Sequence, residues 1–366
     1  MTQERAPLKR GWTTGCCATA AARAAYTALL GGEFPDPVTI ILPKGQTPAF
    51  ALAVHEHGDG WAMAGVIKDA GDDPDATHGV LVRATVRSLK AGSGLVFRAG
   101  PGVGTVTRPG LPIPPGEPAI NPVPRHMIRQ ALEAVARETP GHHQVDLEVT
   151  IAIDEGERIA RSTLNGRLGI VGGLSVLGTT GIVIPFSCSA WIHSIHRGID
   201  VARARALPHV AGSTGSTSET AVQAHYGLDE SALIEMGDFV GGMLKYLKKH
   251  PVPRVTIAGG IAKMAKLGQG MLDVHSRRGA IDLARLARLT REAGGNAGLC
   301  DRIMCANSGL EAFELAGEAG ITLGDRLAES AHVRAAQVIQ HSGIELDVMV
   351  FDRAGLCVGR SVPRTC

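Results

Sequence analysis

Aromatic residues are scarce in this chain of 366 residues, where Phe, Trp and Tyr together make up 4%. Few rings are therefore available to stack on exposed bases. The formal net charge is +2 and charges of both signs are interspersed, whereas nonspecific nucleic-acid binding normally shows a concentrated basic face. We expect no nucleic-acid partner. The first ten residues lack the apolar core of a signal peptide, which predicts a cytoplasmic protein.

Cysteine pairs with metal or redox spacing are also missing. The seven cysteines form no CxxC motif of the kind that binds zinc or forms a redox dithiol, so we expect reduced thiols. Long apolar helices are lacking as well. Residues 168–191 carry no charge, but five glycines and a proline interrupt them, which favours buried strands and turns over a membrane span.

Glycine, with 47 residues, and hydrophobic residues, at 44%, are plentiful, and the length suits two domains. Short strand patterns around two helices predict an α+β domain over residues 1–186. Strands alternating with helices predict a Rossmann-like α/β domain with a mostly parallel sheet over 187–366. Assembly into a homo-oligomer is compatible with the sequence. The expected helices include 14–30, 124–138, 239–250, 281–292 and 325–340; the expected strands include 61–67, 80–86, 145–153, 209–212, 232–236, 254–258 and 346–351.

A helix start near the N-terminus is the first candidate site. Thr13 or Thr14 can cap the helix, Gly15 permits close approach to the backbone, and free N–H groups of the first turn attract an anion. The alternative is an ordinary capped helix. Cys16 and Cys17 are interpreted as packing residues rather than activated nucleophiles.

A strand, a glycine turn and a helix follow one another from His209 to Tyr226, which is the topology of a nucleotide site. Gly212 and Gly215 permit backbone approach, and Glu235 stands near the end of the next strand, where an acid holds ribose hydroxyls. The glycines do not complete a GxGxxG motif. A routine strand-to-helix turn is therefore the alternative.

A second glycine turn precedes Lys263 and Lys266, which lie three residues apart and so share a helix face. Together with the helix dipole they can hold a carboxylate or phosphate, and Arg277 extends the cationic wall. The sequence is not a Walker loop. A solvated basic face is the alternative.

Four carboxylates and a histidine crowd the loop from Lys68 to Gly79. Crowded acids raise one another's pKa, which suits general-base work by Asp69, Asp72 or His78. The acids do not alternate as in an EF-hand calcium loop. An ordinary polar loop, whose aspartates bond their own backbone, is the alternative.

Several long motifs in one order resemble the CbiD family, the cobalt-precorrin-5B C(1)-methyltransferases of anaerobic cobalamin biosynthesis, over nearly the whole chain. They are GWTTGCC at 11–17, VIKDAGDDPD at 66–75 with THG at 77–79, NGRLGIVGGLSVLGTTGIV at 165–183, EMGDFVG at 235–241 and the segment 259–267. The departures are Cys16, where the family more often has a small hydroxyl residue, and Ala262, where it has glycine.

The resemblance implies methyl transfer from S-adenosylmethionine to C1 of a ring-contracted tetrapyrrole. It also implies that cobalt arrives only as part of the substrate, so we expect no metal site in the protein. On this basis Gly172 and Gly173 are expected to line the cofactor cleft with the Gly212–Ser216 turn and Glu235. Substrate carboxylates would face Lys263, Lys266, Arg277 and the helix start, which includes Thr13, Thr14, Gly15 and Cys17. Asp69 or Asp72 would accept a proton or steady the macrocycle.

Two other classes of function stay open on the sequence. A NAD(P)-dependent corrinoid reductase would fit the strand-glycine-helix elements, and it would change nicotinamide absorbance instead of consuming a methyl donor. A noncatalytic corrinoid carrier would capture its ligand stoichiometrically and release no S-adenosylhomocysteine.

Overall fold

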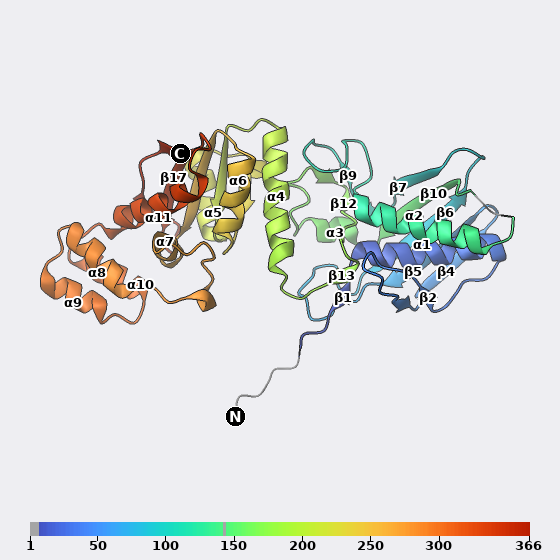
Figure 1. Cartoon of the computed structure of the whole chain (residues 1–366), viewed down its shortest axis with the longest axis horizontal. Helices are drawn as coiled ribbons and strands as arrows, with labels where there is room; N and C mark the ends of the chain where they lie inside the picture. The colour runs from blue at the N-terminus through green and yellow to red at the C-terminus, as the bar shows by residue number, and fades with distance from the viewer. Residues whose placement is uncertain (1–6, 142–143) are drawn as a thin grey trace, which may run out of the picture. The chain divides into compact units, whose positions relative to one another are not determined.

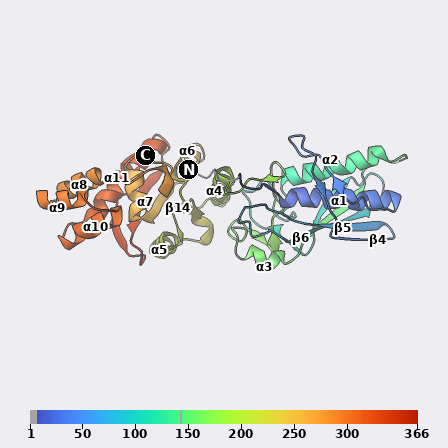
Figure 2. The same cartoon turned by 90° about the horizontal axis from the view of Figure 1, so that it is seen from below.

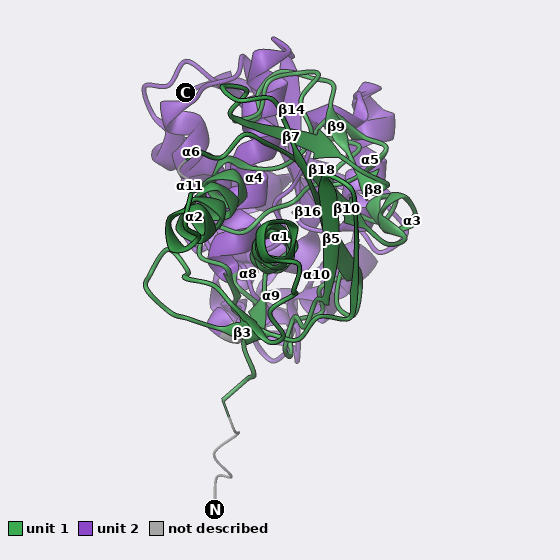
Figure 3. Ribbon diagram, turned by 90° about the vertical axis from the view of Figure 1, so that its right-hand side faces the viewer, with its two compact units in different colours: residues 1–187 green, residues 188–366 purple. Residues whose placement is uncertain are grey.

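The computed structural model describes residues 7–141 and 144–366, except for the side chain of Arg277. The chain divides into two compact units, residues 1–187 and 188–366, which are coloured separately in Figure 3. Among the residues described, no helix is both long enough and apolar enough to cross a membrane.

Unit 1 is built on a five-stranded sheet with the order β4-β5-β6-β10-β7. Its neighbours are antiparallel except β10 and β7. Alternate residues of β10 are buried, so one face of the sheet carries the core. The strands are β4 (Val54–Gly58), β5 (Trp61–Ile67), β6 (Leu81–Ser88), β7 (Leu95–Ala99) and β10 (Leu147–Ile153).

Helices α1 (Thr14–Gly31) and α2 (Pro122–Glu138) lie side by side in unit 1 (Figures 1 and 2). Helix α1 is rich in alanine, and its small side chains let its backbone lie close to β5, β6 and α2. The core therefore contains a row of fully buried alanines beside larger strand residues such as Val149 and Ile151.

Short strands and one short helix complete unit 1. The glycine-rich segment after residue 165 forms β11 (Ile170–Val171), β12 (Gly173–Leu174) and β13 (Ile182–Val183), which pair with β9 (Thr105–Val106), β8 (Gly102–Val103) and β1 (Gly11–Trp12), respectively. The remaining elements are β2 (Val38–Thr39), β3 (Ala49–Phe50) and α3 (Gly156–Ala160). Residues 168–187 thus form short strands and turns, as predicted, whereas residues 188–191 are helical.

Unit 2 contains a sheet with the order β15-β14-β16-β17-β18, and β19 also pairs with β17. The first four strands are parallel, and β18 and β19 run antiparallel to β17. The strands are β14 (His209–Ser213), β15 (Leu233–Glu235), β16 (Arg254–Gly260), β17 (Glu345–Phe351), β18 (Cys357–Arg360) and β19 (Arg364–Thr365).

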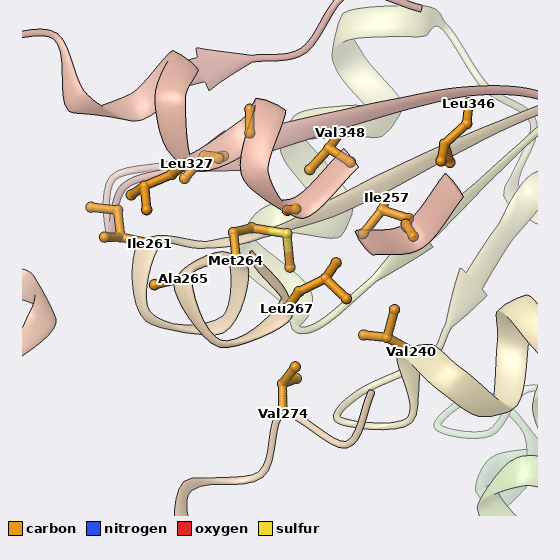
Figure 4. Close-up of a cluster of buried hydrophobic side chains, with 14 of the residues drawn as sticks. Val240, Ile257, Ile261, Met264, Ala265, Leu267, Val274, Leu327, Leu346 and Val348 are labelled. Atoms are coloured by element: carbon orange, nitrogen blue, oxygen red, sulfur yellow. The ribbon is translucent and has the colours of Figure 1, made fainter. Parts of the chain in front are cut away.

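The two faces of this sheet are covered unequally. Helices α4 (Cys188–Ala204), α6 (Val240–Lys249), α7 (Ile261–Gly268) and α11 (Leu323–Ile339) contribute to the larger core, in which Ile257 and Val348 of the strands meet Met264 of α7 (Figure 4). On the other face, Val222 of α5 (Ser216–Tyr226) packs with Ala258. Helices α8 (Leu283–Glu292), α9 (Ala297–Met304) and α10 (Gly309–Glu318) lie between α7 and α11 in the chain.

A buried polar chain crosses the α5 face near the amino ends of the strands. Asp347 is fully buried and accepts hydrogen bonds from Tyr226 Oη and Thr256 Oγ1, each at 2.6 Å. Because the Thr256 hydroxyl gives its proton to Asp347, it accepts from His209 Nε2 at 2.8 Å. Burial and, to a smaller extent, Arg254 lower the pKa of His209 to about 4. His209 is therefore neutral in the folded protein near pH 7.

Two arginines balance the charge of Asp347. Arg254 and Arg360 each approach a carboxylate oxygen of Asp347 at 3.6 Å. Both guanidinium groups also lie over the ring of Tyr226, at 4.9 and 5.5 Å from its centroid. Tyr226 ends α5, so the cluster anchors the far end of this helix to the sheet.

The architecture is mixed α/β, as the sequence predicts, and the expected long helices and central strands are present within a few residues. Helix α4 and strands β18 and β19 were not predicted. The uncharged stretch 168–191 extends into the first turn of α4, so its lack of charge concealed the helix start.

Candidate functional site

A pocket of about 360 Å³ lies at the carboxyl edge of the unit 2 sheet. This volume is within the range of small-molecule sites. The ends of β14, β16 and β17 and the starts of α5 and α7 form its walls. The lining residues are Thr214, Gly215, Ser216, Thr217, Ser218, Gly260, Ile261, Ala262, Lys263, Leu310, Phe351, Asp352 and Arg353.

Sheet topology explains why the pocket forms there. Strand β14 leads into α5 on one face, whereas its neighbour β16 leads into α7 on the other face. The chain therefore leaves adjacent parallel strands in opposite directions and opens a crevice between them. Doubly wound sheets bind ligands at such switch points.

The pocket attracts negative charge. The first turns of α5 and α7 carry backbone N–H groups without intrahelical partners, and both turns line it. Lys263 and Arg353 line it together with one acid, Asp352, while Lys263 also pairs with Asp238, which is not a lining residue. The carboxylate of Asp352 accepts from the N–H groups of Ala354 and Leu356, which fixes the turn after β17. A carboxylate or phosphate group is the ligand class that fits this lining.

The predicted cofactor residues of unit 2 have different surroundings. Gly215 lines the pocket, and a β-carbon there would meet no atom within 4 Å. Gly212 faces the core instead, because a β-carbon there would lie 2.3 Å from Met243 Sδ. Glu235 ends β15 with an exposed side chain, and its Cα pairs with that of Ser213. It borders the turn that leads into the pocket but does not line the pocket.

The other two predicted cofactor residues, Gly172 and Gly173, belong to unit 1. Gly173 packs backbone to backbone, since a β-carbon there would lie 2.3 Å from the carbonyl oxygen of Gly102. Gly172 has a left-handed φ of 84° and open space around it. In this structure Gly173 therefore serves packing, and Gly172 serves a turn.

The predicted lysine pair shares one helix face. Lys263 donates to the carbonyl of Val274 at 3.3 Å and pairs with Asp238, and Lys266 donates to the carbonyl of His275 at 3.2 Å. Both ammonium groups are thus held by one segment, but only Lys263 lines the pocket. The side chain of Arg277 lies outside the described residues.

Neighbouring parts of the chain block access to the start of α1. Thr13 caps the helix, as predicted, and its Oγ1 accepts from Cys16 N at 3.2 Å. The N–H groups of Gly15 and Cys17 donate to the carbonyls of Leu177 and Thr13. Thr13, Thr14, Gly15 and Cys17 are all buried. An anion would reach the N–H group of Gly15 only after the chain near Leu177 had moved, and that of Cys17 is held by the helix itself.

Cys16 and Cys17 are fully buried, and burial raises the pKa of both thiols, to about 12 for Cys17. We predict that native Cys16 and Cys17 react with iodoacetamide at least roughly a hundredfold more slowly than exposed Cys188 and Cys305, because little thiolate forms. Peptide mass spectrometry after timed alkylation measures the rates. Denatured protein provides the control, since all sites should then react alike; fast labelling of native Cys17 would contradict the packing role.

The acidic loop places Asp69 and Asp72 beside Lys9, which precedes β1, and His78 Nδ1 lies 3.9 Å from Asp69. Lys9 Nζ lies 2.7 Å from Asp69, and the backbone N–H of Lys9 donates to Asp72 at 2.6 Å. His78 Nδ1 accepts from Ala70 N at 3.0 Å, so a neutral His78 carries its proton on Nε2.

The expected rise in carboxylate pKa is wrong for Asp69 and Asp75 of this loop. The hydrogen bond from Lys9, with that from Gly71 N, holds the pKa of Asp69 below its usual range. Although burial opposes ionisation of Asp75, the nearby Lys68 ammonium lowers its pKa as well. The sequence reasoning counted the acids but did not place Lys9 and Lys68 among them.

Sequence reasoning missed Asp352 and Arg353 in the pocket. Both directly follow β17, a strand that was predicted. Residues after the carboxyl end of a parallel strand line ligand sites in such sheets, so this position was the available signal. Among the described residues there is no cluster of three or more His, Cys, Asp or Glu side chains that could hold a metal ion.

Fold and site together define a two-unit α/β protein with an anion-attracting pocket at the edge of a parallel sheet. The CbiD family model matches residues 1–185, and the model of the CbiD C-terminal domain matches residues 273–362. The chain belongs to the CbiD family.

Relatives match nearly the whole chain. A protein of Agrobacterium fabrum is 62% identical over 97% of this chain and 93% of its own length. One of Halorhodospira halophila is 60% identical over 97% and 94%. Both are named cobalt-precorrin-5B C(1)-methyltransferase. The crystal structure of a cobalamin biosynthesis protein (cbiD) from Archaeoglobus fulgidus is 28% identical, covers 74% of this chain and 83% of its own, and has a TM-score of 0.40.

Proposed function

We propose that this protein is an enzyme that methylates C1 of cobalt-precorrin-5B to give cobalt-precorrin-6A in anaerobic cobalamin biosynthesis. The observation that carries the proposal is the identity of 55–62% over nearly the full length to relatives named for this activity. The substrate is a tetrapyrrole that brings its own cobalt. The methyl donor is S-adenosylmethionine, which supplies an electrophilic methyl group on a sulfonium sulfur.

The pocket of unit 2, taken as a Rossmann-like domain, is the proposed donor site. The starts of α5 and α7 with Lys263 suit the carboxylate of the amino-acid end. The open space at Gly215 admits the ligand to the backbone. Glu235, one strand away, suits the ribose hydroxyls. Gly212 supports this turn from the core side.

Unit 1 is the proposed tetrapyrrole-facing domain. In the acidic loop Lys9 holds the pKa of Asp69 below its usual range, so Asp69 is better suited to orient the substrate than to act as a base of raised pKa. Asp72, which accepts from the backbone N–H of Lys9, is the second proposed orienting group. His78 presents an Nε2–H group that can donate to a peripheral carboxylate. Methyl transfer requires mainly alignment of donor and acceptor carbon, which needs no protein nucleophile.

Incubation with cobalt-precorrin-5B and methyl-labelled S-adenosylmethionine tests the reaction. We expect one labelled methyl group in the corrinoid for each S-adenosylhomocysteine formed. A loss of NADPH absorbance with no transfer of label would indicate the reductase. Stoichiometric capture of the corrinoid without S-adenosylhomocysteine would indicate a carrier, and either result would overturn the proposal.

We predict that Glu235→Ala weakens binding of S-adenosylhomocysteine roughly tenfold or more, because a charged acceptor for hydroxyl groups is lost. Titration calorimetry measures the affinity. Glu292→Ala is the matched control, since Glu292 is an exposed residue at the end of α8. Equal affinities of the two variants would remove Glu235 from the donor site.

A further inference from the structure

Trp191 is a large aromatic side chain that the described reaction does not yet use. It lies in the first turn of α4, and 45% of its surface is exposed. Its indole Nε1 donates to the carbonyl of Glu235 at 3.1 Å. A fixed and exposed indole thus stands at the carboxyl end of β15.

The loop after β15 is shaped to receive this ring. Gly237 has a left-handed φ of 54°, and a β-carbon there would lie 3.3 Å from Cζ2 of Trp191. The N–H groups of Met236 and Gly237 both donate to the carbonyl of Ser213. Hydrogen bonds and packing therefore tie the indole to the ends of β15 and β14, while nearly half of its surface stays open to solvent.

The distance from Trp191 to the pocket suits an extended ligand. Glu235 pairs with Ser213 of β14, and Ser213 in turn pairs with Ala258 of β16. Neighbouring strands lie about 4.8 Å apart, so the end of β15 and that of β16 are about 10 Å apart. A nucleoside joined to an amino-acid chain can span this distance, with the ribose between its two ends.

We propose that Trp191 stacks on the adenine ring of the methyl donor and so selects an adenosyl ligand. The inference rests on the proposed function. A purine presents a flat π surface, and an aromatic side chain held in place stacks on such a surface at a low cost in conformational entropy. In this arrangement Trp191 positions the base, Glu235 holds the ribose, and the starts of α5 and α7 hold the amino-acid carboxylate.

Tryptophan fluorescence gives a readout independent of catalysis. The other two tryptophans, Trp12 and Trp61, belong to unit 1. We expect S-adenosylhomocysteine, and adenosine alone, to quench fluorescence in the wild type and in W61F, but not in W191F. In calorimetry, W191A should bind S-adenosylhomocysteine roughly tenfold to a hundredfold more weakly, and W191F should lie between W191A and the wild type.

The outcomes separate the two proposals. Suppose that the wild type binds S-adenosylhomocysteine, but the fluorescence of W191F is quenched as strongly or folded W191A keeps its affinity. Trp191 then only holds α4 against β15, and only the stacking role fails. Thermal melts distinguish this case, since a tie alone would lower Tm without lowering affinity. If the wild type binds neither compound, both the stacking role and the proposed donor site fail.

Discussion

Replacement of Asp347 by alanine is expected to destabilise unit 2 by about 3–5 kcal/mol. Asp347 is fully buried and lies beside Arg254 and Arg360, so its removal leaves Arg360 without this acid and Arg254 with only the partly exposed Glu345. Tyr226 and Thr256 also lose a charged acceptor. Urea unfolding followed by hydrogen exchange in β14, β16 and β17 measures the loss.

Two further variants test the electrostatic explanation. Asp347→Asn keeps the shape and one acceptor oxygen, so we expect a smaller loss than for alanine. Asp301→Ala changes an exposed acid in α9 and should stay within about 0.5 kcal/mol of the wild type. If Asp347→Ala were as stable as Asp301→Ala, the cluster would not anchor α5.

Adjacent glycines of unit 1 are expected to respond very differently to alanine. Gly173→Ala would place a β-carbon 2.3 Å from the carbonyl oxygen of Gly102, so two backbone segments must separate. We expect a loss of about 3 kcal/mol or more in the free energy of unfolding of unit 1. Urea unfolding in a W191F background measures it, since the tryptophan fluorescence then comes from Trp12 and Trp61 of this unit.

Gly172→Ala is the internal control for this substitution. Its φ of 84° strains alanine, but no atom lies within 4 Å, so we expect a cost of only about 1 kcal/mol. Equal stabilities of the two variants would contradict the backbone packing seen at Gly173. If Gly173→Ala were as stable as the wild type but bound the methyl donor more weakly, Gly173 would belong to the cofactor site.

Local periodicity was sufficient to predict most of the framework. The alternation in β10 and the β-branched runs of β16 and β17 are visible in the sequence because each strand meets one or two buried faces. Helix α4 was not predicted because an uncharged segment that contains glycines leads directly into it. Strand β18 was not predicted because its burial depends on pairing with β17, which is known only from the fold.

The candidate site was predicted in part for a similar reason. Gly215 and Lys263 were named as site residues, although for different ligands, and the structure brings them to one pocket. Sequence spacing could not reveal that Gly212 faces Met243, or that Lys9 lies beside Asp69. Such contacts join residues distant in the chain, and they determine pKa and accessibility.

The helices inserted between β16 and β17 have a consequence for the folding of the newly made chain. The two strands are neighbours in the sheet, yet α7 to α11 separate them along the chain. During synthesis on the ribosome, one edge of β16 therefore stays unpaired until β17 has emerged. Unpaired edges promote association between chains, and contacts this distant in sequence form slowly. Completion of the pocket, whose lining includes Phe351 of β17, is accordingly a late event in the folding of unit 2.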